Sequence, residues 1–263
     1  MYIADAGLLM RIKDGYTEIV NFEPSYLTPD IIRSFKNDLY ILTKPWQDDD
    51  GYYFGIIRLG AHGAEGIHIS EADYISVEDF TFSRDGLIFY ILRNDGLGIT
   101  YLNSMNPNDP DDIVTLCEIP SGTSSLAVGD RGEVYLANPD TGAICVWRDG
   151  ELGYFAGVEG EKAFIDGIAP LFYMPQNISF ADGFLYVWDF NVMRRVAVSD
   201  GFADECITIA GEASPTFDLD VWDDALLAED IIFPNSMLMD FAVTEDGVLI
   251  TDPKRGLVWL VEH

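Results

Sequence analysis

Residues 181–211, which read ADGFLYVWDFNVMRRVAVSDGFADECITIAG, decide the fold. An Asp-Gly pair between apolar runs is a strong hairpin signal, because the turn needs φ > 0 and glycine reaches it without a steric clash. With the apolar strand that precedes the first turn, this segment predicts four antiparallel strands. The runs and turns after that strand are Asp182-Gly183, Leu185–Asp189, Arg194–Val198, Asp200-Gly201 and Cys206–Ala210.

The same unit recurs along the chain. An apolar strand that usually ends in a polar residue finishes at positions 5, 43, 93, 138, 189 and 252, so successive units are 38 to 63 residues apart. In five of the six units another apolar strand and a tight polar turn come before it, and a further strand follows in each. Repeats of four antiparallel strands at such spacing are typical of propeller blades. We therefore predict an all-β fold with one domain over residues 1–263, a six-bladed β-propeller of four-stranded antiparallel blades.

The charge balance disfavours some classes of partner. The chain has 45 acidic and 15 basic residues, a formal charge of −30 and a pI near 4.1. Nucleic-acid binding needs a basic surface that displaces counterions from phosphates, and an anionic membrane repels the same negative charge. The sequence also has no apolar run of the ~18 residues that indicate a membrane-spanning helix. We expect no nucleic-acid binding, no membrane insertion and a monomer that its charge keeps soluble.

The cysteines and histidines do not indicate a disulfide framework or a zinc site. Cys117, Cys145 and Cys206 are far apart and lack CxxC spacing, so we expect them to pack as small apolar residues. His62 and His68 fall in one unit, and the third histidine is His263. This distribution disfavours a catalytic zinc site with histidines from several blades.

Residues 153–211 resemble two consecutive joints of NHL repeats. The landmarks come in the family's order: Asp166-Gly167, then Pro175, an inner strand and Arg194. The chain departs from the family at Val192-Met193, and the resemblance is weaker over roughly the first 115 residues. It implies a six-bladed propeller that binds peptides, proteins or RNA, a minority of the family being lyases or hydrolases. The sequence is also similar to bacterial extracytoplasmic NHL proteins of unassigned function, which implies a secreted or extracytoplasmic protein whose leader is absent from this chain.

Four polar residues are predicted to begin innermost strands and to meet at the central channel: Asp79, Ser125, Asn177 and Asp240, with Ile31 as an apolar equivalent. Oxygen ligands of this kind suit Ca²⁺ or Mg²⁺. The arrangement resembles gluconolactonase-like propellers, which bind a divalent ion in a comparable place for lactone hydrolysis. The alternative, which we favour, is that these side chains hold channel waters and cap strand ends.

Two aspartates, Asp189 and Asp252, end second strands and could join this ring. Each is followed within a few residues by basic side chains. We therefore expect local ion pairs instead, between Asp189 and Arg194 or Arg195, and between Asp252 and Lys254 or Arg255.

Trp188 and Phe190 flank Asp189, and aromatic rings beside an acidic group can form a platform for a ligand. Our leading prediction is a non-enzymatic propeller that binds a protein, peptide or glycan partner through its acidic channel face. Trp188, Asp189 and Phe190 are the predicted ligand-binding residues, and no catalytic residue is predicted. The alternative is a divalent-metal-dependent hydrolase of the gluconolactonase-like type, with Asp79, Asn177 and Asp240 in its metal ring.

Overall fold

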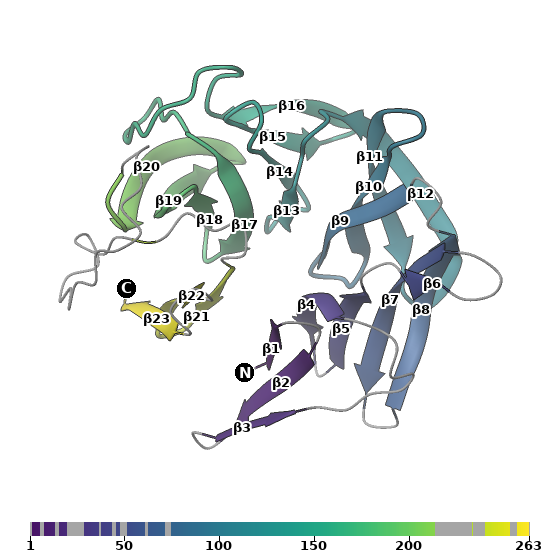
Figure 1. The fold of residues 1–263 in the computed structure, drawn as a ribbon. Helices are drawn as coiled ribbons and strands as arrows, with labels where there is room; N and C mark the ends of the chain where they lie inside the picture. The colour runs from purple at the N-terminus through teal and green to yellow at the C-terminus, as the bar shows by residue number, and fades with distance from the viewer. Residues whose placement is uncertain are drawn as a thin grey trace. The chain divides into compact units, whose positions relative to one another are not determined.

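The computed structural model describes residues 2–5, 8–13, 16–19, 29–36, 38–43, 46–47, 52–60, 63–71, 75–213, 233, 240–252 and 257–262. The chain divides into two compact units, Met1–Ile119 and Pro120–His263, and each is described by itself. All regular elements in these ranges are β-strands (Figure 1). His62, His263, Lys254 and Arg255 lie outside the described residues.

Three antiparallel sheets make up the first unit. The first sheet has the order β1 (Tyr2–Asp5), β2 (Leu8–Lys13) and β3 (Tyr16–Ile19). The second has the order β4 (Pro29–Phe35), β5 (Asp38–Thr43), β7 (Tyr52–Gly60) and β6 (Trp46–Gln47), and β8 (Gly63–Glu71) also pairs with β7. The third has the order β9 (Ile75–Phe82), β10 (Ile88–Asn94), β11 (Ile99–Asn106) and β12 (Asp109–Ile119).

The second unit also contains three antiparallel sheets. One has the order β13 (Ser125–Val128), β14 (Val134–Asn138), β15 (Ala143–Arg148) and β16 (Glu151–Ala156). The next has the order β17 (Pro175–Ala181), β18 (Phe184–Asp189), β19 (Val192–Ser199) and β20 (Phe202–Ala210). The last has β21 (Phe241–Thr244), β22 (Gly247–Asp252) and β23 (Leu257–Glu262).

These sheets confirm the predicted all-β class and the four-stranded antiparallel blade. The sheets β9–β12, β13–β16 and β17–β20 each have four strands in sequence order. The predicted number, six four-stranded blades, is not confirmed, because β1–β3 and β21–β23 are three-stranded sheets in the described part of the chain. Strand pairing at the two ends depends on contacts distant in sequence, which the spacing of repeats does not specify.

The Asp-Gly turns form the predicted hairpins. Asp182 has φ 51° and Gly183 has φ 78°, and this left-handed pair connects β17 to β18. Two residues with φ > 0 are the requirement of the type I′ turn, whose twist matches that of the paired strands. The Asp149-Gly150 and Asp200-Gly201 pairs have the same signs of φ.

The core lies between the faces of neighbouring sheets. β18 is buried along Leu185–Asp189, whereas the outermost strand β20 has several exposed residues, because only inner strands are covered on both faces. One cluster of buried side chains joins β13–β16 to β17–β20 and includes Tyr135, Ile144 and Phe172. In this unit β17 lies beside both β13 and β21, so consecutive innermost strands are neighbours.

Several innermost strands contain a β-bulge. In β17, Pro175 lies opposite Asp189 and Asn177 lies opposite Trp188, so Gln176 is the extra residue. The registers of β4 and β9 shift in the same way, at residues 30 and 78. A bulge redirects the side chains next to it, and bulges are frequent beside functional sites. Ile31, Asp79 and Asn177 each follow such a bulge and are equivalent positions, as the sequence analysis expected.

Candidate functional site

Asp79, the predicted metal ligand of the first unit, already has a cationic partner. Its Oδ1 lies 2.7 Å from Nη2 of Arg33 on β4, and the same oxygen accepts a 2.8 Å hydrogen bond from the amide of Phe80. Arg33 Nε donates to the carbonyl of Phe80 at 3.1 Å. Arg33 therefore joins β4 to β9 and balances the buried charge of Asp79.

Ser125, a predicted ligand in the second unit, also connects neighbouring strands. Its Oγ accepts a 3.2 Å hydrogen bond from the amide of Ile178, and the Oγ of Ser124 donates to the carbonyl of Gln176 at 2.7 Å. The two hydroxyls therefore satisfy alternate backbone groups along the edge of β17. This use agrees with the interpretation that polar residues at strand starts satisfy backbone groups.

Asn177 and Asp240 complete the predicted set within the second unit. Asn177 follows the bulge of β17, and Asp240 is exposed immediately before β21. Asp240 Oδ1 accepts a 2.8 Å hydrogen bond from the amide of Phe241, as Asp79 does from the amide that follows it. Among the described residues no group of three His, Cys, Asp or Glu side chains could hold a metal ion. The metal ring stays a prediction, and calcium has no assigned place.

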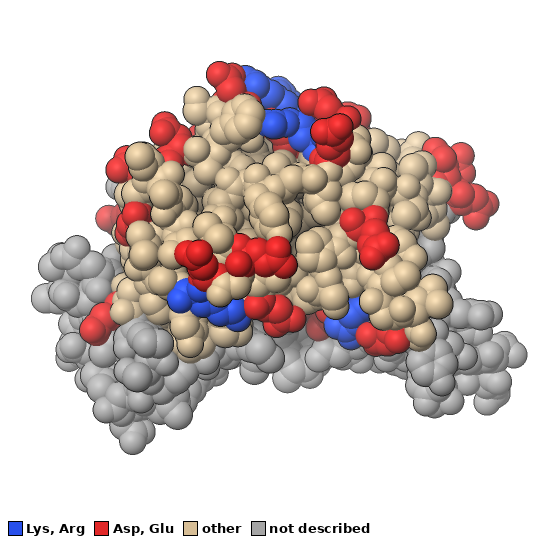
Figure 2. All heavy atoms as spheres, turned by 90° about the horizontal axis from the view of Figure 1, so that it is seen from above, with Lys and Arg blue, Asp and Glu red and all other residues tan. Residues whose placement is uncertain are grey.

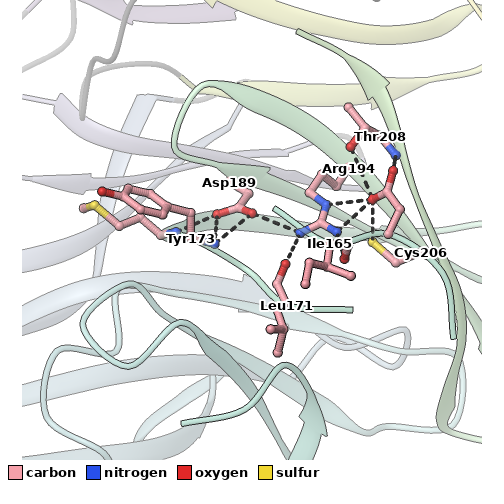
Figure 3. A network of polar contacts seen from close by, with 9 residues as sticks. Ile165, Leu171, Tyr173, Asp189, Arg194, Cys206 and Thr208 are labelled. Carbon is pink, nitrogen blue, oxygen red and sulfur yellow. Dashed lines mark hydrogen bonds and ion pairs between the residues drawn. The ribbon is translucent and has the colours of Figure 1, made fainter. Parts of the chain in front are cut away.

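The predicted ion pair between Asp189 and Arg194 is confirmed. Arg194 Nη1 lies 3.1 Å from Asp189 Oδ2, and both side chains have 0% exposure (Figure 3). Asp189 also accepts hydrogen bonds from the amides of Tyr173, at 3.0 Å, and Met174, at 2.6 Å. The carboxylate at the end of β18 therefore holds the chain that leads into β17.

Arg194 also holds residues 165–171 in place, as Figure 3 shows. Its guanidinium donates to the carbonyls of Ile165 and Leu171, the latter at 2.7 Å, and lies 2.8 Å from Asp166 Oδ1. Asp166 accepts a 2.8 Å hydrogen bond from the amide of Thr208 on β20. We call residues 157–174 the connecting segment. The Arg194 network attaches this segment to three strands of one sheet.

Burial changes the titration of these groups. Desolvation raises the pKa of Asp189, and Arg194 with the two amide donors opposes that effect. Desolvation lowers the pKa of Arg194, but Cys206, Asp189 and Asp166 together raise it by more, so the guanidinium stays charged. Burial raises the pKa of the Cys206 thiol to about 12. Cys145 and Cys206 are buried free thiols, as expected for small apolar residues, and Cys117 is half-buried.

Trp188 and Phe190 do not form the predicted exposed platform. The side chains of Trp188 and Phe190 are 1% and 5% exposed. Trp188 packs into the core against Phe233, with ring centroids 5.3 Å apart. Asp189 between them has 0% exposure. A ligand at the surface therefore cannot lie on the ring of Trp188 or contact the carboxylate of Asp189.

Phe190 instead belongs to a group of three rings, Phe164, Tyr173 and Phe190, which we call the aromatic cluster. Phe164 and Tyr173 are stacked, with centroids 5.1 Å apart and an interplanar angle of 21°. Tyr173 meets Phe190 edge-on at 5.0 Å. Phe164 and Tyr173 are half-buried, so part of each ring is accessible. Sequence reasoning missed both, because the connecting segment has no strand periodicity; Tyr173, two residues before Pro175, was the available signal.

The backbone at Phe190 is strained. Its φ is +63°, a region that bulky residues rarely occupy. Its amide donates to the carbonyl of Met174 at 3.1 Å, which attaches the turn after β18 to the residue before β17. Strain of this kind persists only where the surroundings impose it, and it is concentrated at functional sites.

Gln176, on the bulge of β17, supplies an unpaired polar atom. Its exposure is 8%, and its Oε1 has no hydrogen-bond partner in the described part of the chain. Leaving a buried acceptor unpaired costs about 1–3 kcal/mol, so such an atom needs an explanation. Gln176 follows Tyr173 by three residues and is the extra residue at the start of β17.

Charged side chains of both signs lie on the surface. On the face shown in Figure 2, groups of basic side chains lie beside acidic ones. Arg131 pairs with Asp200 at 2.7 Å, and Arg93 pairs with Glu78 at 3.0 Å. No helix among the described residues is long and apolar enough to cross a membrane.

Comparisons with known proteins identify the fold but no family. No protein-family model matches the sequence, and no curated protein matches it. Solved structures do. A protein of unknown function from Bacteroides thetaiotaomicron has a TM-score of 0.67 at 13% identity, over 97% of this chain and 62% of its own. An auxiliary nutrient binding protein from the same species has a TM-score of 0.69 at 14% identity, over 98% and 67%. YCF48 bound to D1 peptide has a TM-score of 0.52 at 13% identity, over 95% and 70%.

The chain has the β-propeller fold. It spans 62% of the length of the first of these proteins and 67% of the second. Membership of the NHL family stays a prediction, because these likenesses are of fold alone.

In a propeller, the start of an innermost strand and the end of the second strand lie on one face, because the two strands are antiparallel neighbours. Here Pro175 pairs with Asp189 at that position. The aromatic cluster, Gln176 and the Arg194 network therefore occupy the blade face on which the sequence placed the ligand site. The rings that reach the surface are those of Phe164 and Tyr173 instead of Trp188.

Proposed function

We propose that this propeller is a non-enzymatic binding protein, and that a protein, peptide or glycan ligand docks on the aromatic cluster. The observation that carries the proposal is the pair of half-buried, stacked rings, Phe164 and Tyr173, on a segment that Arg194 fixes to the sheet. Aromatic rings contribute large contact area with little conformational entropy to lose. Because the connecting segment is already held in place, less conformational entropy is lost when a ligand binds.

The comparisons support a binding role by analogy of fold. One similar structure is described as an auxiliary nutrient binding protein, and another is described as bound to a D1 peptide. A fold alone does not determine function, so the analogy is secondary to the site.

The buried network supports a positioning role instead of a catalytic one. Asp189 and Arg194 have 0% exposure, and their polar atoms are occupied by each other, by Asp166 and by backbone groups. A general acid or base must come within hydrogen-bond reach of its substrate. We therefore assign to Asp189 and Arg194 the task of holding Tyr173 and its neighbours in place.

Binding to defined probes tests the proposal. The purified chain is applied to an array of immobilised oligosaccharides and to an array of immobilised peptides of about twelve residues, as wild type and as Phe164→Ala and Tyr173→Ala. Phe202→Ala is the matched control, because Phe202 is 62% exposed and begins β20, at the far end of the sheet. We expect specific signals that the control keeps and the two cluster variants lose. No signal on either array, or equal signals from all variants, would refute the proposal.

A further inference from the structure

Basic side chains lie over several phenylalanine rings of this chain. The face of an aromatic ring attracts a cation with about 0.5–1 kcal/mol at exposed sites and about 2 kcal/mol or more when desolvated. Four basic side chains lie 4.5 to 5.0 Å from the centroid of a phenylalanine ring. The pairs are Lys36 with Phe35, Arg148 with Phe202, Arg194 with Phe172 and Arg195 with Phe184.

The two accessible rings of the aromatic cluster have no such partner within the described ranges, where no basic side chain lies over Phe164 or Tyr173. Nearby basic groups are engaged elsewhere: Lys162 donates to the carbonyl of Pro139 at 2.8 Å, and Arg194 is buried in its network. The described part of the chain therefore leaves this cation-accepting surface open to a cation from outside.

The electrostatic field favours a cation there. The formal charge of the chain is −30, and Glu159, Glu161 and Asp166 on the connecting segment are exposed. A surplus of one sign raises the local concentration of oppositely charged ligands and speeds their association. The same field opposes phosphate and other anionic ligands.

A cation suits this surface better than an uncharged group does. An ammonium or guanidinium group would bring its positive charge both to the faces of the rings and to the acidic surroundings. A neutral sugar would use the rings but not the negative field.

We propose that the ligand of the aromatic cluster is a lysine or arginine side chain of a basic peptide segment in a protein partner, seated on Phe164 and Tyr173. This inference rests on the proposed binding function and names the chemistry of the ligand. It makes the acidic surface part of the recognition, because the charge guides the basic segment to the rings.

Calorimetric titration of the whole chain with three probes tests this inference. The probes are a lysine-containing Gly-Ser peptide of about twelve residues, the same peptide with every lysine Nε-acetylated, and a neutral xylan-derived hexasaccharide. Acetylation removes the charge and keeps the length of the side chain. We expect the lysine peptide to bind at least about tenfold more tightly than its acetylated form, and binding to weaken as salt rises.

Variants locate the binding. Phe164→Leu and Tyr173→Leu keep an apolar side chain but remove the aromatic face, and each should weaken the lysine peptide by about tenfold. Phe202→Leu, at the far end of the sheet, should leave it unchanged. Equal binding of the two peptides, or no binding of the lysine peptide, would overturn the cationic assignment. Hexasaccharide binding that Phe164→Leu abolishes would overturn it too, while leaving the binding function intact.

Discussion

Replacing Arg194 by methionine tests whether the buried network stabilises the fold. Methionine fills a similar apolar volume but donates no hydrogen bond. The side chain of Asp189 would remain at 0% exposure with only the amides of Tyr173 and Met174 as donors. Removing one member of a buried ion pair costs about 3–5 kcal/mol, since the other charge is left uncompensated.

The loss extends beyond the ion pair. The carbonyls of Leu171 and Ile165 would lose their guanidinium donors, and a hydrogen bond to a charged group contributes about 1.5–3 kcal/mol. The total is a large share of the 5–15 kcal/mol that stabilises typical proteins. We therefore expect Arg194→Met to lower the urea midpoint strongly, measured by circular dichroism.

Arg195→Met is the matched control. Arg195 is the next residue on β19, and its guanidinium lies 4.5 Å from the ring centroid of Phe184. Losing a partly exposed contact of this kind costs about 1 kcal/mol or less. Hydrogen exchange at the amides of Tyr173 and Met174 should also accelerate in Arg194→Met and not in the control. A free energy of unfolding for Arg194→Met within about 0.5 kcal/mol of wild type would refute this account of the network.

Three further predictions concern single sites. Gly157→Ala should lower the free energy of unfolding by at least about 2 kcal/mol in thermal unfolding, because a Cβ there would lie 2.7 Å from the carbonyl oxygen of Gly142. Gly150→Ala should cost only about 1 kcal/mol, because Gly150 has a similar positive φ but open space around it. Ser125→Ala should cost about 1–3 kcal/mol in urea unfolding by leaving the amide of Ile178 unpaired, and a smaller cost would mean that water replaces the hydroxyl. Burial raises the pKa of the Cys206 thiol from 9.0 to about 12, so the folded state binds more protons than the unfolded state above about pH 9. The free energy of unfolding should therefore be constant below about pH 9 with respect to this thiol and fall above it by up to ~1.4 kcal/mol per pH unit. Cys206→Ala should flatten this slope in urea midpoints measured from about pH 8 to 10.5, and an unchanged slope would contradict the assignment.

Local chemistry made part of the fold predictable. The Asp182-Gly183 turn has φ > 0 at both residues, and such a turn sets the register of the strands beside it. The pairing of Asp189 with Arg194 was predictable for the same reason, since the two residues lie on adjacent strands of one hairpin. Asp166 was not, because it meets Arg194 across 28 residues through a segment with no periodic pattern.

The predicted metal ring shows that the position of a residue in the repeat does not determine what the residue binds. Ser125 does begin an innermost strand, whereas Asp79 lies inside β9, directly after the bulge at residue 78. Their partners, Arg33 and the amide of Ile178, belong to neighbouring strands and are distant in sequence. Position in the repeat therefore identified equivalent places on successive innermost strands, whereas tertiary contacts determined which of these residues are buried and what they bind.

The backbone at Phe190 explains why Trp188 and Phe190 do not share one face. In a strand, residues two apart share a face, so Trp188 and Phe190 should point the same way. The φ of +63° at Phe190 ends that alternation: Trp188 packs against Phe233 in the core, while Phe190 meets Tyr173 edge-on. Residues that break a local rule are expected where function demands it. If the strain serves to support Tyr173, then Phe190→Leu should weaken ligand binding as Tyr173→Leu does, although Phe190 itself is only 5% exposed.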